Sequence, residues 1–282
     1  MSNSIYLATT DPRSGKSLVS LGIMELLLRR TTRVGVFRPV ISPPPPFLQT
    51  DEGSYRDKNI DLLLTHFMLD IDYEDTYAFV ESEAADLIAQ GRYDDVLDRI
   101  IEKYKALESQ CDFILCIGSD LEEGGVVLEF DFNADVAKNL GCPVLIVSSG
   151  KNRDVRTTIN SLRASRDAFV ERGCQVVGAV VNRADLDALP AIRAALAAEL
   201  PQDDVVLSVI PAHASLSSPT LREVTDQLGA EVLYGADQLD RLAQHPLVIA
   251  MHVHNYLTHL TECALLITPG DRSDVILSAL QA

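Results

Sequence analysis

The sequence predicts an α/β fold in which a mostly parallel sheet carries helices on both faces and a smaller α/β unit follows. Three observations predict it. Apolar runs typical of strands alternate with amphipathic stretches typical of helices along most of the chain. The run 113–117 is apolar at every position, as expected for a strand in the middle of such a sheet. The alternation pauses in the polar stretch 215–220 and then restarts, which indicates a second unit.

The first strand, 5–8, and the first helix, 18–28, flank a loop that ends in Gly15-Lys16-Ser17. This order is typical of a phosphate-binding loop, in which backbone N–H groups face an anion, a lysine reaches the outer phosphates and a hydroxyl holds magnesium. Thr10 stands where the first glycine of that pattern belongs, so the loop is either a working variant or a relic. The plainer alternative is a turn at Gly15, an N-cap at Ser14 and a solvated Lys16. We predict an anion or nucleotide site that includes Thr10, Ser14, Gly15, Lys16 and Ser17.

The second strand, 33–40, ends before four successive prolines at 43–46, and a polar surface segment then runs to about residue 59. Further along, Val96, Ile100 and Tyr104 recur at helical spacing. The other elements expected in this unit are strands 142–147, 176–181 and 205–210 and helices 60–69, 83–108, 132–140, 155–172 and 189–199.

The second unit is expected to begin with a helix that Thr220 caps and that runs to residue 228. Strands at 232–234, 247–251 and 264–268 are expected to follow, with helices at 238–243, between the last two strands and from 273 onward. We expect domains at 1–213 and 214–282, with the second one incomplete and the chain forming the N-terminal part of a longer protein.

Polar residues that follow strands are the candidates for ligand binding, because ligands of open parallel sheets gather beyond the carboxyl ends of the strands. Asp120 is the acid closest to the end of strand 113–117, so it is the candidate magnesium partner of Ser17, with a turn or cap aspartate as the alternative. Arg38 is a candidate anion ligand or a surface ion-pair partner. Asn182 is a candidate adenine-reading amide or a turn residue.

Composition narrows the function classes. The net charge of −17 argues against a nucleic-acid surface, which needs clustered lysine and arginine. The five cysteines lie singly in or beside apolar runs and fit buried thiols in a reducing compartment. Neither a signal peptide nor an apolar run long enough to span a bilayer is visible, so a cytoplasmic protein without membrane attachment is expected. The six histidines form no metal or catalytic pattern, and no nucleophile elbow is visible.

The chain resembles the N-terminal region of the long-form bacterial phosphate acetyltransferases, whose first domain is itself similar to dethiobiotin synthetase. The segment Ile267-Thr268-Pro269-Gly270-Asp271-Arg272-Ser273 resembles the signature of the DRTGG-type regulatory domain of that family. Further segments that carry the resemblance are 10–17, 34–39, 113–120, 133–140, 178–182, 209–211 and 218–220.

The resemblance implies a regulatory or assembly role in an acyltransferase of acetate metabolism that converts acetyl-CoA and phosphate to acetyl phosphate and CoA. It implies that the catalytic residues lie in a C-terminal transferase domain, the partner of this region, and that the protein forms homo-oligomers. Dethiobiotin synthetase has Gly where Thr9 stands, Lys where Arg38 stands and Glu where Ile117 stands, which favours a retained fold without the synthetase reaction.

Two other functions stay open. An ATP- and Mg²⁺-dependent enzyme or nucleotide switch would use Lys16, Ser17 and Asp120. A positioning ATPase of the cell-division type would need a second lysine early in the loop, where this chain has Arg13.

Overall fold

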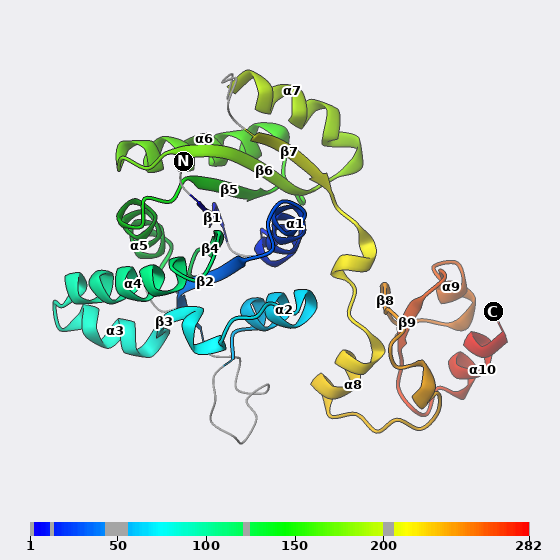
Figure 1. The fold of residues 1–282 in the computed structure, drawn as a ribbon. Coiled ribbons are helices and arrows are strands. Elements are labelled where there is room, and N and C mark those ends of the chain that lie inside the picture. Colours follow the sequence, from blue (N-terminus) through cyan, green and yellow to red (C-terminus); the bar gives the residue numbers. More distant parts are fainter. Residues whose placement is uncertain (1–2, 12–13, 43–55, 121–124, 200–205, 282) are drawn as a thin grey trace. The chain divides into compact units, whose positions relative to one another are not determined.

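The computed structural model describes residues 3–11, 14–42, 56–120, 125–199 and 206–281. The chain divides into two compact units, residues 1–212 and residues 213–282. The first unit is a seven-stranded parallel sheet with helices on both faces, which confirms the predicted fold class (Figure 1). Its strands are β1 (Ser4–Thr9), β2 (Val34–Ile41), β3 (Tyr77–Val80), β4 (Phe113–Ile117), β5 (Val144–Ser149), β6 (Val176–Ala184) and β7 (Val206–Pro211). Its helices are α1 (Lys16–Leu28), α2 (Lys58–Phe67), α3 (Glu81–Ala89), α4 (Tyr93–Glu108), α5 (Gly125–Asn139), α6 (Val155–Glu171) and α7 (Leu189–Glu199).

The strand order is β3-β2-β4-β1-β5-β6-β7. The chain builds outward on one side of β1 as far as β3, returns to β4, and then crosses to β5 on the other side of β1. Such a reversal opens a crevice at the carboxyl ends of the central strands, where ligands of this architecture bind. The loop after β1 therefore lies where the sequence placed the anion site.

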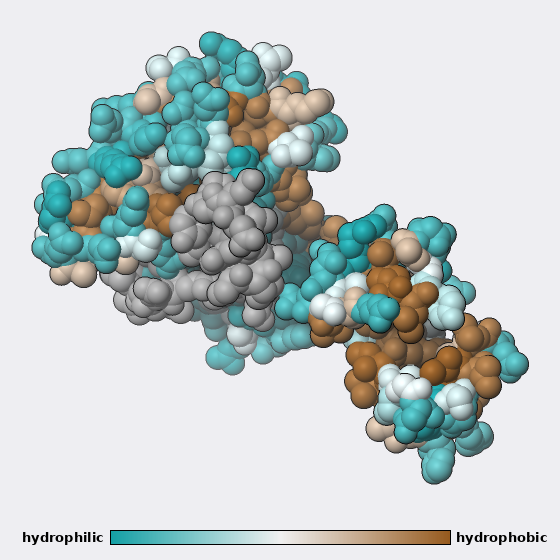
Figure 2. Space-filling view, turned by 90° about the horizontal axis from the view of Figure 1, so that it is seen from below, coloured by the Kyte–Doolittle hydropathy of each residue, from teal (hydrophilic) through white to brown (hydrophobic). Residues whose placement is uncertain are grey.

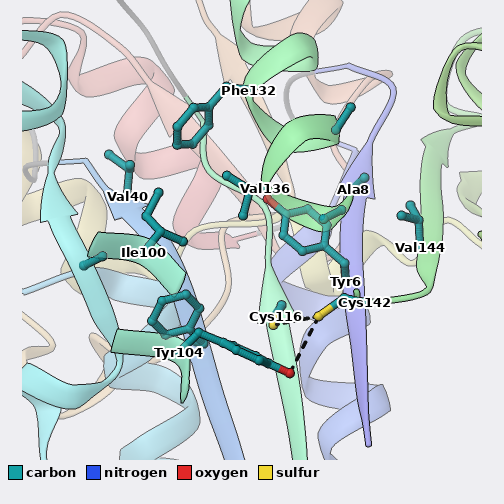
Figure 3. Close-up of a cluster of buried hydrophobic side chains, with 14 of the residues drawn as sticks. Tyr6, Ala8, Val40, Ile100, Tyr104, Cys116, Phe132, Val136, Cys142 and Val144 are labelled. Atoms are coloured by element: carbon teal, nitrogen blue, oxygen red, sulfur yellow. Dashed lines mark hydrogen bonds between the residues drawn. The ribbon is translucent and has the colours of Figure 1, made fainter. Parts of the chain in front are cut away.

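The two faces of the sheet have separate cores. On one face, Met24 of α1 and Leu63 of α2 pack against Val36 and Leu115. On the other face, α3, α4, α5 and α6 cover the largest cluster, part of which Figure 3 shows. Because both faces of the central strands are covered, β2 and β5 are buried along their whole length.

The largest cluster also contains two neighbouring thiols. Cys116 and Cys142 lie with their sulfur atoms 3.9 Å apart, and the Cys142 sulfur lies 3.8 Å from the Tyr104 hydroxyl (Figure 3). Cys174 is buried as well, but Cys111 is half-buried and Cys263 is exposed, so the expectation of five buried thiols is wrong for those two. All five cysteines are free.

Two features of the first unit differ most from the sequence prediction. The single helix expected over 83–108 is two helices, α3 and α4, because the chain turns at Gly91, which has a φ of 75°. The short strand β3 was not predicted; it pairs with β2 as an edge strand and buries Ala78 and Phe79. The prolines at 43–46 lie outside the described residues.

The second unit contains α8 (Leu221–Leu228), β8 (His245–Val248), α9 (Val253–Leu257), β9 (Ala264–Ile267) and α10 (Ser273–Gln281). Thr220 caps α8 as predicted, in a capping box with Glu223. Strands β8 and β9 form a two-stranded parallel sheet over a small core of Ile249, Tyr256 and Val275.

Two predicted elements of this unit are wrong. Residues 232–234 form no strand, and the segment expected to be helical at 238–243 contains only the end of a 3₁₀ turn at Ala236–Gln238. Figure 2 shows brown, apolar residues at the surface of this unit. The exposed apolar residues of this unit include Leu233, Val248, Leu277 and Leu280. No helix of the described ranges is long and apolar enough to cross a membrane.

Candidate functional site

The loop between β1 and α1 turns at Gly15, which has a φ of 84° and a ψ of 33°. This left-handed conformation is accessible to glycine without strain, and it lets the first turn of α1 begin at Lys16. The carbonyl oxygen of Gly15 accepts the first helical hydrogen bond, from the Val19 N–H. The loop therefore has the backbone geometry of a helix N-terminus at the carboxyl edge of the sheet, which favours anions.

The centre of the site is a chain of four charged side chains. The Lys16 Nζ donates to Asp120 Oδ1 at 2.6 Å and to the Gly118 carbonyl oxygen at 2.6 Å. Arg38 donates from Nη2 to Asp120 Oδ2 and from Nη1 to Asp57 Oδ2, both at 2.7 Å. The Asp120 carboxylate thus bridges two cations through its two oxygens.

The strand order explains why these residues meet. Lys16 follows β1, Asp120 follows β4 and Arg38 lies on β2, and these three strands are adjacent in the sheet. Asp57 comes from outside the sheet: it is the N-cap of α2 and accepts hydrogen bonds from the Asn59 and Ile60 N–H groups. The predicted residues Lys16, Arg38 and Asp120 are therefore brought together.

The backbone before Asp120 is held rigidly by Asn133 of α5. The Asn133 amide accepts from the Ser119 N–H at 2.9 Å and donates to the Ser119 carbonyl at 3.0 Å. The Ser119 hydroxyl accepts from the Val40 N–H of β2, and the Tyr6 hydroxyl donates to Asn133. These hydrogen bonds hold the backbone that follows β4 in place, and they thereby position the backbone of Asp120.

The surroundings of Lys16 and Asp120 lower the pKa of both side chains. Burial, together with the nearby Arg38 charge, lowers the pKa of Lys16 to about 8, against the opposing effect of Asp120. For Asp120, partial burial acts to raise the pKa, but the charges of Lys16 and Arg38 outweigh it, so the pKa lies below its ordinary value. Asp120 is therefore ionised at neutral pH.

Ser17 and Asp120, the predicted magnesium ligands, have different partners in the structure. The Ser17 hydroxyl donates to the Asn59 amide oxygen, whereas Asp120 is bound by Lys16 and Arg38. Hydroxyl, amide and carboxylate oxygens are hard donors that suit Mg²⁺, so the donor set fits this ion in kind. No group of three or more histidine, cysteine, aspartate or glutamate residues that could hold a metal occurs among the described residues.

The remaining predicted site residues line the loop. The Thr10 hydroxyl donates to Asp11 at 2.6 Å and lies 3.1 Å from the Ser148 hydroxyl, so this side chain is engaged with the end of β5. Asn182 lies within β6, is 1% exposed, and donates from Nδ2 to the Ser14 carbonyl at 3.0 Å. In this structure Asn182 supports the loop.

Within the described part of the chain, three buried polar atoms of this site have no hydrogen-bond partner: Ser14 Oγ, Arg38 Nε and Asn182 Oδ1. Each of the three residues is no more than 2% exposed. Unpartnered buried polar groups are costly, and each one in a native structure needs an explanation, such as a bound ion or water. Their concentration at the loop distinguishes this site from the rest of the described structure, where Thr268 Oγ1 is the fourth such atom.

Asp57, Asn59 and Asn133 are site residues that the sequence pattern did not indicate. A signal for Asp57 exists, because an aspartate directly before an amphipathic helix is typical of an N-cap. Asn59 and Asn133 lie within helices, and their position in the site depends on tertiary packing.

Residues 3–220, well over half of the chain, match the family described as an AAA domain. Residues 223–282 match the DRTGG domain, as the segment around Arg272 predicted.

The phosphate acetyltransferase of Nitratidesulfovibrio vulgaris is 42% identical over 99% of this chain and 39% of its own length. That of a Synechocystis strain is 41% identical over 100% of this chain and 40% of its own length. An ATP-dependent dethiobiotin synthetase of a Sulfurovum strain is 27% identical over 57% of this chain and 76% of its own length. The chain thus spans about two fifths of the length of these phosphate acetyltransferases. The predicted resemblance is confirmed: the chain belongs to the AAA domain family and continues into a DRTGG domain, a pairing that matches phosphate acetyltransferases.

Proposed function

We propose that this chain is the N-terminal regulatory and assembly portion of a phosphate acetyltransferase, and that its loop site binds a phosphoryl anion without catalysing acetyl transfer. The parent reaction would form acetyl phosphate and CoA from acetyl-CoA and phosphate, in a C-terminal transferase domain. The match to phosphate acetyltransferases over 99% of the chain supports the parent activity.

The observation that carries the assignment of a binding role is the Lys16–Asp120–Arg38–Asp57 network. The four charges of this network are engaged with one another: Lys16 and Arg38 supply the cationic donors that an anion needs, and the two acids of the network, Asp120 and Asp57, are already bound to them. Such a site is suited to binding an anionic metabolite and reporting its presence.

The test is acetyl transfer by the purified chain. Phosphate-dependent release of the CoA thiol from acetyl-CoA is expected to stay at the uncatalysed rate, and a rate that rises with protein concentration would contradict the proposal. Light scattering on the same sample tests assembly. The exposed apolar side chains of the second unit support self-association, so a homo-oligomer is expected and a monomer at all concentrations would contradict it.

A second candidate function is an ATP- and Mg²⁺-dependent dethiobiotin-synthetase-like enzyme or nucleotide switch. The Gly15-Lys16-Ser17 loop at the start of α1 and the similarity to a dethiobiotin synthetase favour it. Ser17 and Asp120 would hold the ion, which would supply charge neutralisation of the phosphates. Titration calorimetry with ATP and Mg²⁺ on the wild type and Lys16→Ala tests it: heat that depends on Lys16 supports nucleotide binding, and the same heat from both rejects this use of the loop.

A further inference from the structure

The Asp120 carboxylate occupies the position that suits an anionic ligand in the loop site. Its two oxygens lie 2.6 Å from the Lys16 Nζ and 2.7 Å from an Arg38 Nη atom. A phosphoryl group binds lysine and arginine through two of its oxygens in the same way. The Asp120 carboxylate therefore binds Lys16 and Arg38 as an anionic ligand would.

The two acids of the network differ in how firmly they are held. Asp57 has a side chain that is 4% exposed, and it also caps α2 through two backbone N–H groups. The Asp120 side chain is 46% exposed, and the described contacts of its carboxylate are those with Lys16 and Arg38. Water can solvate Asp120 if it leaves, whereas removing Asp57 would uncover a buried arginine and a helix end. Asp120 is the exchangeable acid.

We propose that Asp120 is a tethered competitor of the anionic ligand, which a phosphoryl group must replace between Lys16 and Arg38 in order to bind. This inference rests on the anion site of the proposed function and adds a residue that sets its affinity and selectivity. A ligand with few oxygens gains little by the exchange, because Asp120 already satisfies both cations.

The unpartnered donors of the site indicate which ligand gains most. Asp120 uses both carboxylate oxygens on Lys16 and Arg38, yet Arg38 Nε and Ser14 Oγ stay without partners at 2% exposure each. A phosphoryl group brings three or more acceptor oxygens, so after replacing the carboxylate it has a further oxygen to offer. A carboxylate ligand has none. The site is thus selective for phosphoryl over carboxylate anions.

The experiment is a titration with pyrophosphate in metal-free buffer at neutral pH, followed by calorimetry. Asp120→Asn keeps the shape of the side chain and removes its charge, and we expect it to bind pyrophosphate about tenfold more tightly than the wild type. Adding Lys16→Met to Asp120→Asn should abolish the gain. Acetate should not bind to the wild type, because it offers Lys16 and Arg38 no more acceptor oxygens than the Asp120 carboxylate already does.

Asp112→Asn is the matched control. Asp112 directly precedes β4, whereas Asp120 follows its end; Asp112 also pairs with an arginine, Arg33, and the substitution removes the same charge. We expect its affinity for pyrophosphate to equal that of the wild type. A gain as large in Asp112→Asn as in Asp120→Asn would mean that net charge alone controls binding, and it would overturn the inference.

The outcomes separate the inference from the proposed function. Equal binding by the wild type and Asp120→Asn overturns the competition and leaves the anion site standing. No binding by either protein overturns both the competition and the anion site. If melting shows that Asp120→Asn is not folded, Asp120→Ser makes the same comparison, because it also removes the charge and leaves a smaller side chain.

Discussion

The side-chain amide of Asn182 fills the space next to Gly15 in which a β-carbon would lie. An alanine at position 15 would place its Cβ against Asn182 Nδ2, closer than any non-bonded contact, in a backbone conformation with φ of 84° that disfavours it. The loop that follows β1 therefore packs directly against β6, through Gly15 and Asn182, which are 167 residues apart in the sequence.

Gly15→Ala is therefore expected to lower the free energy of unfolding by about 2 kcal/mol or more, and to remove anion binding by displacing the loop. Gly22→Ala is the matched control, because Gly22 is an exposed residue inside α1 with open space around its Cα. It should raise stability by about 0.5–1 kcal/mol. Urea unfolding of both variants measures the difference, and equal effects would contradict the role assigned to the loop.

Asn182→Ala tests the other half of the contact. It removes the hydrogen bond to the Ser14 carbonyl and leaves that carbonyl buried, so a loss of about 1–2 kcal/mol is expected. In the double variant with Gly15→Ala the clash disappears while the backbone strain remains. The two losses should then sum to more than the loss of the double variant, with a coupling of about 1 kcal/mol. Strict additivity in urea unfolding would show that the two residues do not interact.

The site residues that were predicted from the sequence are those that the parallel sheet itself brings together. Lys16, Arg38 and Asp120 follow or lie near the ends of parallel strands, and any parallel sheet brings such positions to one edge. The partners Asp57 and Asn59 come from α2, after a long polar segment whose path no pattern specifies. They meet Arg38 and Ser17 across 19 and 42 residues of sequence.

The missed strand β3 and the wrongly predicted strand 232–234 have a common physical cause. Strand β3 is four residues long, and its strand character depends on pairing with β2. Residues 232–234 are just as apolar, but with Leu233 and Tyr234 exposed they pair with no strand of the described chain. An apolar run becomes a strand only where a neighbouring strand is available to complete its hydrogen bonds, and that is a property of the whole fold.

Substitutions of Asp57 should separate its two roles. Asp57→Ala removes one of the two acids paired with buried Arg38 and also the cap of α2. Because Asp120 still pairs with Arg38, we expect the lost pair to cost less than the roughly 3–5 kcal/mol of a fully unpaired buried charge, and the lost cap to cost about 1 kcal/mol. Asp57→Asn keeps a capping oxygen and removes the charge, so it should be less destabilised by about the value of the cap. Thermal and urea unfolding measure both.

The comparison for these variants is Asp112→Asn, which breaks an ion pair of exposed side chains. Exposed pairs are screened by water, so little change in stability is expected. If Asp57→Asn were as stable as Asp112→Asn, the Arg38–Asp57 pair would not matter for folding.

The lowered pKa of Lys16 predicts a specific pH dependence. With a folded pKa of about 8 against an ordinary value of 10.5, the folded protein releases this proton at lower pH than the unfolded chain. Below pH 8 both states hold the proton and the buried charge costs stability. Between pH 8 and 10.5 the unfolded state holds more protons, so the contribution of Lys16 to the free energy of unfolding rises, by about 3 kcal/mol in total.

The measurement is the difference in unfolding free energy between the wild type and Lys16→Met, followed from pH 7 to 11. This difference isolates Lys16 from the other groups that titrate at alkaline pH, and it should shift in favour of the wild type across that window. Lys105→Met, at an exposed position of α4, provides the baseline for the loss of a lysine charge. Pyrophosphate affinity should move in the opposite direction, falling as the pH rises through about 8, because neutral Lys16 no longer attracts the anion. If the difference in unfolding free energy stayed constant from pH 7 to 11, then burial and the Arg38 charge would not lower the pKa of Lys16 in the folded protein.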